Sequence, residues 1–235
     1  MKIHIYSIMR NEEFLLPYFL RHYSTFADKI FIIDDHSTDR TAEIAKANPK
    51  VELIPFPFER GLNEDDFSRC FEGSYRKYSQ GIADWVMCVD GDEFVYTNNI
   101  YKNLDKHRHL GTGVLRCTAY TMVSEKLPSG NGQIYEESFM GARCRGFDKP
   151  IIFNPTIEIR FGDGRHKIKV PPGIEIKKSH FLLLHYRYLS ESFFLERSKM
   201  DFSRMDMSNE IKDYRINRGR KWYADVLKNG LTKVI

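Results

Sequence analysis

Short apolar runs alternate with amphipathic segments through residues 1–90, and this alternation limits the fold more than any other feature. Strands that alternate with helices form parallel sheets with right-handed crossovers. The sequence therefore predicts an α/β fold with a mostly parallel sheet. The expected strands are residues 3–8, 29–33, 51–54 and 85–89.

Helices are expected between these strands. Apolar residues recur at three-and-four spacing over residues 12–25, with Asn11 as a suitable N-cap and Glu12 and Glu13 in the first turn. A shorter helix is expected after Ser37-Thr38-Asp39. A long one is expected over residues 64–80, with Gly81 at its end.

Acidic residues follow two of the expected strands directly. Asp34-Asp35 ends the second strand, and Asp90-Gly91-Asp92 ends the fourth. In parallel α/β sheets, ligands bind in the crevice outside the carboxyl ends of the strands. Both clusters are therefore expected at one ligand-binding edge.

The Asp90-Gly91-Asp92 cluster has the composition of a site for a hard divalent cation. Magnesium and manganese prefer carboxylate oxygens, and two aspartates one residue apart can point to a shared position. One is expected to hold the metal and the other the metal or a ribose hydroxyl, while Gly91 permits close approach to the backbone. The alternative is a solvated acidic turn.

The Asp34-Asp35 pair places two like charges side by side. We interpret one carboxylate as a cap for backbone amides in the turn and the other as an acceptor of hydrogen bonds from a nucleotide base. Ser37, Thr38 and Asp39 are assigned to capping the following helix.

From about residue 111 the pattern changes to shorter strand-like pieces separated by turns, followed by helical segments over residues 191–228. No composition shift marks a linker, so residues 1–235 are expected to form one domain. The segment 124–145 is polar and turn-rich, which is typical of a loop over a site.

The formal net charge of +4 is too weak and too dispersed to indicate nucleic-acid binding. It suits a protein that handles an anionic substrate, and equally one that rests on an anionic membrane surface. The four cysteines match no metal or disulfide pattern. No apolar stretch reaches the roughly 18 residues of a membrane span. We expect a reduced, cytoplasmic protein, with contact at the inner face of the membrane left open.

Three motifs together carry a resemblance to a known family. In order, they are Arg-Asn-Glu after the first strand, Asp-Asp-His-Ser-Thr-Asp-x-Thr, and Asp-Gly-Asp-Glu-Phe. This order resembles the family-2-like glycosyltransferases of the GT-A superfamily, in the branch whose metal motif reads Asp-x-Asp-Glu-Phe. The resemblance covers the first hundred residues well and continues loosely to about residue 200.

The resemblance implies a GT-A (Rossmann-like) fold, with helices flanking a mostly parallel central sheet and a small antiparallel addition in the second half. Residues 1–110 would bind the nucleotide, and residues 111–235 would bind the acceptor and supply C-terminal helices. The implied activity is inverting transfer from a UDP- or dTDP-sugar, with Mn²⁺ or Mg²⁺, to a glycan or lipid-linked acceptor, for example in polysaccharide synthesis.

The resemblance also implies roles for individual residues. Asp35 would bind the base while Asp34 braces the turn, and Asp90 would meet the ribose and the metal. Asp92 would hold the metal and the diphosphate. The remaining nucleotide contacts are the Ser7 backbone and Arg69. His185 or His166 would complete the metal site, and Lys149 would contact phosphate or sugar.

The catalytic base is the least determined element. Inverting transfer needs a carboxylate that takes the proton of the acceptor hydroxyl. The Glu-Asp pair that opens a later helix in many family-2 enzymes is not found here. Glu93 and Asp148 are the leading candidates, ahead of Glu136 and Glu137.

Two other classes share parts of this pattern. A metal-dependent nucleotidyltransferase would need a glycine-rich basic loop after the first strand, but residues 8–12 contain no glycine. A non-catalytic nucleotide- or glycan-binding module would bind ligand without turnover. A phosphatase that used Asp34 and Asp35 would leave the later acidic motif without a purpose.

Overall fold

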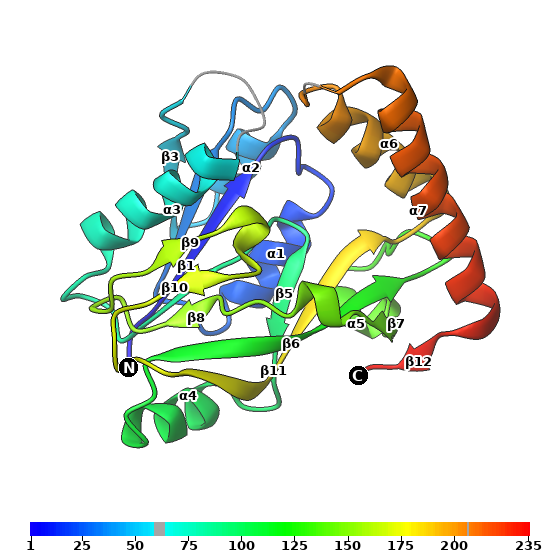
Figure 1. The fold of residues 1–235 in the computed structure, drawn as a ribbon. Helices are drawn as coiled ribbons and strands as arrows, with labels where there is room; N and C mark the ends of the chain where they lie inside the picture. The colour runs from blue at the N-terminus through cyan, green and yellow to red at the C-terminus, as the bar shows by residue number, and fades with distance from the viewer. Residues whose placement is uncertain (59–63, 206) are drawn as a thin grey trace.

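The computed structural model describes residues 1–58, 64–205 and 207–235, and within them a ten-stranded mixed sheet dominates (Figure 1). Four parallel strands form its first half, in the order β3-β2-β1-β4. Their bounds are β1 Ile3–Met9, β2 Lys29–Asp34, β3 Val51–Pro55 and β4 Trp85–Cys88. These are the four strands that the apolar runs predict.

Both faces of β1, β2 and β4 are buried, as expected for strands that are apolar almost without interruption, whereas the edge strand β3 is partly exposed. Ile3 and Ile5 of β1 pack in one cluster with α1 (Leu16–Tyr23) and α2 (Thr41–Lys46). Tyr6 points to the opposite face, where it packs with α3 (Glu64–Tyr78). The alternation follows from the two-residue repeat of a strand.

The second half adds strands that are mostly antiparallel. Short β8 pairs with β4 and with β6, β7 pairs with β6, and β12 pairs with β7, all antiparallel. Long β11 runs parallel to β6 and antiparallel to β5. Their bounds are β5 Glu93–Tyr96, β6 Val114–Val123, β7 Met140–Arg143, β8 Ile152–Phe153, β11 Ile176–Tyr188 and β12 Thr232–Lys233.

Smaller elements complete this half. A separate two-stranded sheet pairs β9 with β10; one 3₁₀ turn precedes β8, and another connects β9 to β10. Helices α4 and α5 lie between the strands of the larger sheet. Their bounds are α4 Ile100–His109, α5 Ile134–Glu137, β9 Arg160–Phe161, β10 Ile168–Lys169, and 3₁₀ turns at Arg145–Phe147 and Asp163–Arg165.

Two C-terminal helices, α6 (Glu191–Phe202) and α7 (Asn209–Asn229), stand together along one edge of the molecule (Figure 1). They approach closely at Gly219, where an added Cβ would lie 2.2 Å from Cζ of Phe194. Phe194 also stacks on Tyr188 of β11, with ring centroids 4.6 Å apart. This aromatic packing holds α6 against the sheet.

The expected α/β fold, with parallel central strands and an antiparallel addition in the second half, is confirmed. The segment 124–145 contains α5 and β7. No helix within the described ranges is long and apolar enough to cross a membrane.

The start of the first helix differs from the prediction. The helix begins at Leu16, with Pro17 in its first turn, so Asn11 is not its cap and Glu12 and Glu13 precede it. Asn11 instead takes a left-handed conformation with φ of 52°. The reason is that side chains of residues 37–41, after β2, accept hydrogen bonds from the backbone N–H groups of residues 11, 12 and 13.

Candidate functional site

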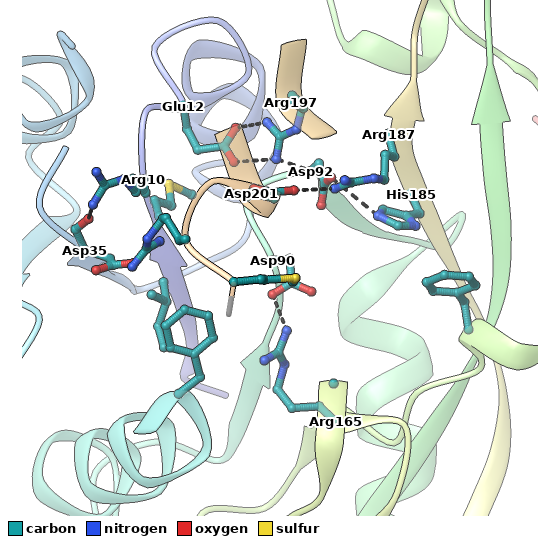
Figure 2. A pocket seen from close by; sticks show the side chains of 18 of the residues that line it. Arg10, Glu12, Asp35, Asp90, Asp92, Arg165, His185, Arg187, Arg197 and Asp201 are labelled. Carbon is teal, nitrogen blue, oxygen red and sulfur yellow. Dashed lines mark hydrogen bonds and ion pairs between the residues drawn. The ribbon is translucent and has the colours of Figure 1, made fainter. Parts of the chain in front are cut away.

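A cavity of about 530 Å³, here called the site cavity, opens where β1, β2 and β4 end. Its lining includes Asp35, Asp90 and Asp92, together with His185 of β11. Figure 2 shows Asp35 on one side, Asp92 and His185 on the other, and Asp90 between them. The parallel topology therefore brings the two acidic clusters to one edge, as the sequence predicts.

The loops after β1 and β2 are joined by side-chain to backbone hydrogen bonds. Ser37 Oγ accepts from the N–H of Asn11 at 3.0 Å, and Thr41 Oγ1 accepts from that of Glu12 at 2.7 Å. Asp39 accepts from the N–H groups of Glu13 and Thr41. Asp39 thus caps the start of α2 as expected, whereas Ser37 serves the opposite loop.

Three residues near the cavity combine a side chain with a positive φ. They are Asn11 (52°), His36 (55°) and Arg165 (59°). Left-handed backbone is costly for residues other than glycine, and it gathers at functional sites where the surroundings enforce it. Arg10, next to Asn11, and Arg165 itself line the site cavity.

The two aspartates after β2 have different partners. Asp34 Oδ1 accepts a hydrogen bond from the N–H of Ser37 at 3.2 Å, within the turn. Asp35 is 1% exposed, and its Oδ2 lies 2.6 Å from Nη1 of Arg204. Its Oδ1 is buried with no hydrogen-bond partner among the described residues. A buried acceptor without a donor is a point where a ligand N–H gains most.

Asp90 is held by two basic side chains. Lys149 Nζ donates to Oδ2 at 3.0 Å, and Arg165 donates to Oδ1. Lys149 is buried and also contacts Glu93 Oε1 at 2.6 Å. Burial favours the neutral acid, but Arg165 and Lys149 outweigh it and lower the pKa of Asp90 to about 2.

The same contacts keep Lys149 charged. Burial alone would lower the pKa of this ammonium group, but Asp90 and Glu93 outweigh the burial and raise it. A buried ammonium group within reach of two carboxylates is therefore a permanent positive charge on the wall of the site cavity.

Asp92 is buried and faces a histidine and an arginine. Its Oδ2 lies 3.4 Å from Nε2 of His185 and 3.4 Å from Nη2 of Arg197. Burial opposes ionisation, yet His185 and Arg197 hold the pKa of Asp92 well below its usual range. Both separations exceed an ordinary N–H···O hydrogen bond of about 2.7–3.2 Å, so neither partner is closely bonded to this oxygen.

Glu12 and Arg197 form a buried bidentate pair beside this motif, with N–O distances of 2.5 and 2.7 Å (Figure 2). Gly91 explains how the pair fits. A Cβ at Gly91 would lie 3.0 Å from Cδ of Glu12, so the glycine admits the Glu12 side chain against the turn. The sequence predicts that a ligand approaches the backbone at Gly91, whereas the Glu12 carboxylate of the protein occupies that position.

Helix α6 and the residues after it supply much of the cavity's charge. Arg197 reaches Glu12 and Asp92, Asp201 pairs with Arg187 at 2.9 Å, and Arg204 pairs with Asp35. Glu12 and Asp92 raise the pKa of Arg197 although burial alone would lower it. Helix α6 and the residues directly after it are thus fastened to both acidic clusters by ion pairs.

Two histidines flank the ring of Phe147 at the cavity wall. The ring centroid of His166 lies 5.3 Å from that of Phe147, and that of His185 lies 5.2 Å from it. Nδ1 of each is buried without a hydrogen-bond partner in the described part of the chain. Burial, with Lys149 and Arg165 nearby, lowers the pKa of His166, so its imidazole is neutral at pH 7.

Four other residues selected from the sequence lie differently. The side chains of Ser7 and Glu93 are fully buried, while Ile8 and Met9 line the cavity next to Ser7. Arg69 is exposed, binds Asp66 and stacks on Phe58, and it does not line the site cavity. Asp148 binds Arg143 at 2.6 Å and the N–H of Ala119 at 2.8 Å, also outside that lining.

Within residues 1–58, 64–205 and 207–235, no three His, Cys, Asp or Glu side chains are grouped closely enough to hold a metal ion by themselves. Asp92 and His185 are the one facing carboxylate–histidine pair at the site cavity in those ranges.

Several residues that line the site cavity were not predicted from the sequence to belong to it. Glu12 is interpreted from the sequence as an ordinary acid of a helix start. Arg165, Arg187, Arg197, Asp201 and Arg204 receive no role. One signal was available: Arg197 lies three and four residues after Phe194 and Phe193, on the helix face that packs inward. A charge at such a position needs a buried partner.

Comparisons with known proteins give structural similarity alone. No protein-family model matches the chain, and no curated protein matches it. The structure of S. aureus TarS 1-349 is similar with a TM-score of 0.48 and 13% identity, over 91% of this chain and 68% of that chain. The same TarS fragment in complex with UDP-GlcNAc gives 0.45 and 13%, over 91% and 70%.

A third similar structure is glucosyl-3-phosphoglycerate synthase from Mycobacterium tuberculosis, solved with Mn²⁺, UDP and glucosyl-3-phosphoglycerate. Its TM-score is 0.37 at 16% identity, over 51% of this chain and 44% of that chain. At such distances the function has to be argued from the residues of the site itself.

Proposed function

We propose that this protein is a metal-dependent glycosyltransferase of the GT-A type, which transfers a sugar from a nucleotide diphosphate sugar to an acceptor. One observation carries the proposal. The acidic clusters after β2 and β4 line a single cavity together with His185, Lys149 and Arg165. A nucleotide diphosphate needs both an acceptor for its base and positive charge for its phosphates, and this cavity offers both.

For the nucleotide, we propose that Asp35 accepts hydrogen bonds from the base and that Asp90 contacts the ribose. The free Oδ1 of Asp35 supports this role, because a buried carboxylate oxygen without a donor favours a ligand N–H. Asp34 braces the turn through Ser37. The backbone near Ser7 would lie along the nucleotide, and a UDP- or dTDP-sugar is the proposed donor.

For the metal, the Asp92–His185 pair fits a Mn²⁺ or Mg²⁺ ion. Neighbouring ligands bound at about 2.1 Å to an octahedral ion lie about 3.0 Å apart, so Oδ2 and Nε2, which are 3.4 Å apart, would move slightly closer when the ion binds. Magnesium commonly keeps only one or two protein ligands, with water and substrate phosphates completing its shell. When bound, the ion would neutralise charge on the departing diphosphate. Asp90 and His166, which line the same cavity, are proposed as further ligands of the ion.

For the phosphates and sugar, we propose Lys149 and Arg165. Both are buried, both are charged, and both line the cavity beside Asp90. Arg69, which the resemblance suggests for this role, points to Asp66 instead, so Arg165 is the better placed guanidinium. Fixed cations in a partly buried cavity stabilise developing negative charge without reorganisation.

For the catalytic base, which takes the proton of the acceptor hydroxyl, we propose Asp201. Glu93 is fully buried, and Asp148 does not line the site cavity. Asp201 lines the site cavity and stays 28% exposed beside Arg187. It therefore offers a carboxylate that an acceptor hydroxyl can reach, as inverting transfer requires.

For the acceptor, we propose that residues 111–235 of a single domain bind a glycan or lipid-linked molecule, while residues 1–110 bind the nucleotide. Glycan synthesis at the inner face of a membrane would suit such a division. A non-catalytic binding module and a nucleotidyltransferase are the competing functions, and they differ in whether the donor sugar is released.

The test is titration of UDP into the protein, with and without Mn²⁺, followed by assay of UDP-sugar hydrolysis. We expect binding that needs Mn²⁺ and is lost in Asp92→Asn and His185→Ala. The matched control is Asp105→Asn, an exposed acid of α4, which should bind UDP as the wild type does. Failure of UDP, dTDP, GDP and CMP to bind with either metal would end the glycosyltransferase proposal. Binding without sugar release would favour the binding module.

A further inference from the structure

A second cavity, of about 270 Å³, lies away from the site cavity and shares no lining residue with it. It is formed by the end of α1, the end of β5, the turn 97–99, the start of α4 and Tyr135 of α5. In Figure 1, α1 and β5 lie near the centre of the picture, α5 lies to their right and α4 lies below them. We call it the tyrosine cavity after Tyr96, Tyr101 and Tyr135, which line it.

Among the residues that the structure describes, no Asp, Glu, Lys or Arg lines the tyrosine cavity, in contrast to the site cavity. Its one titratable imidazole, His22, is buried, and its Nε2 is 2.9 Å from the carbonyl oxygen of Val95. Burial lowers the pKa of His22 to about 4, so the ring is neutral at pH 7. A phosphate, carboxylate or ammonium ligand would have no charged partner there.

The lining combines aromatic rings with uncommitted polar groups. The rings of Tyr96 and Tyr135 meet edge to face at 5.1 Å, and Tyr101 is 47% exposed. Within the described residues, the hydroxyls of Tyr96 and Tyr135 and the amide of Asn98 make no side-chain hydrogen bond. By contrast, Asn99 caps α4, Thr97 accepts from Asn103, and Tyr101 donates to the Phe26 carbonyl.

Such a lining suits a ligand with an apolar face and a ring of hydroxyl groups. Small-molecule sites are mostly apolar and aromatic, with a few polar groups that fix orientation. We propose that the tyrosine cavity binds one neutral pyranose unit of a glycan. A pyranose presents C–H groups to an aromatic ring and hydroxyls to amide and phenol groups. The volume lies near the lower end of the range for ligand sites, about 300–1,000 Å³, and suits one ring.

The position of the cavity fits a site that works beside the site cavity. Strand β5 runs from Glu93, beside the acidic motif, to Tyr96, a span of roughly 10 Å at about 3.3 Å per residue. The binding of a sugar here does not depend on the proposed transferase activity.

The test uses full-length protein and two neutral probes, cellotriose and chitotriose, titrated with and without UDP and Mn²⁺. We expect saturable binding of at least one probe that UDP does not displace. The variant Tyr96→Phe/Asn98→Ala should weaken it at least about fivefold, because two hydrogen bonds are lost. Two matched controls, Tyr214→Phe on the exposed face of α7 and Asp92→Ala in the site cavity, should leave it unchanged.

Three results would each overturn the proposal: no saturable binding of either probe, binding that survives Tyr96→Phe/Asn98→Ala, or binding that UDP displaces. Loss of UDP binding in Asp92→Ala with saccharide binding kept would separate this site from the site cavity.

Discussion

Removing the guanidinium of Arg197 should destabilise the protein strongly. In Arg197→Met, the carboxylate of Glu12 is left buried and unpaired, because the two side chains are only 12% and 7% exposed and share two hydrogen bonds. Breaking one side of a buried ion pair costs about 3–5 kcal/mol of unfolding free energy. For a chain of this size that corresponds to a fall in Tm of about 6–20 °C.

The assay is urea unfolding followed by circular dichroism, supported by thermal melts. The matched control is Arg40→Met, because Arg40 pairs with Glu43 in the same chemistry while both side chains are more than half exposed, at 68% and 67%. We expect no measurable change for that variant. The double variant Glu12→Gln/Arg197→Met should lose less than the sum of the single changes, because it leaves no unpaired charge at Glu12. An Arg197→Met loss no larger than that of Arg40→Met would refute the reasoning.

Two further predictions concern packing and pH. Gly73 of α3 has nothing within 4 Å of an added Cβ, so Gly73→Ala should stabilise the fold by about 0.5–1 kcal/mol, whereas Gly219→Ala should destabilise it by about 1–3 kcal/mol because its Cβ would meet Phe194. Thermal melts of the two variants should therefore shift in opposite directions, and shifts of the same sign would contradict the α6–α7 contact. His22 is neutral when folded, with its pKa lowered to about 4 by burial, and has a pKa of about 6.5 when unfolded. The unfolded chain therefore binds the extra proton, and stability should fall by about 3 kcal/mol between pH 6.5 and 4. This slope should decrease in His22→Gln and stay unchanged in His109→Gln, and an unchanged slope in His22→Gln would exclude His22 as a source of it.

The ion pairs of the site cavity explain why a change at Arg197 should also affect function. Asp35 and Asp92 each lie beside an arginine from the C-terminal region, Arg204 and Arg197. A nucleotide and its cation would compete with these arginines for the same carboxylates. Changes at Arg197 should therefore be separated into effects on folding and effects on UDP binding by measuring both.

The positions of the four parallel strands, and the burial of their apolar residues, follow from the sequence alone. Short continuous apolar runs such as residues 30–33 favour strands buried on both faces, and such strands require helices on each side. Because parallel strands end at one edge, the meeting of Asp35 with Asp90 and Asp92 also follows from local pattern.

The local sequence pattern did not predict the start of the first helix correctly, because side chains distant in the sequence bind the N–H groups there. Asn11, Glu12 and Glu13 have the composition of a helix start, yet the loop after β2 accepts their N–H groups and the helix begins at Leu16. A cap supplied from more than twenty residues away leaves no signal at helical spacing.

The partners of the acidic residues were decided only by the tertiary structure. Lys149, Arg165 and Arg197 come from segments 59, 75 and 105 residues away from the aspartates that they contact. Strand order brings Lys149 and Arg165 to Asp90, and the docking of α6 on β11 brings Arg197 to Asp92. Residue types and strand ends determined where charge gathers. Long-range packing determined which charges neutralise one another, because ion pairing depends on distance in space and not on distance along the chain.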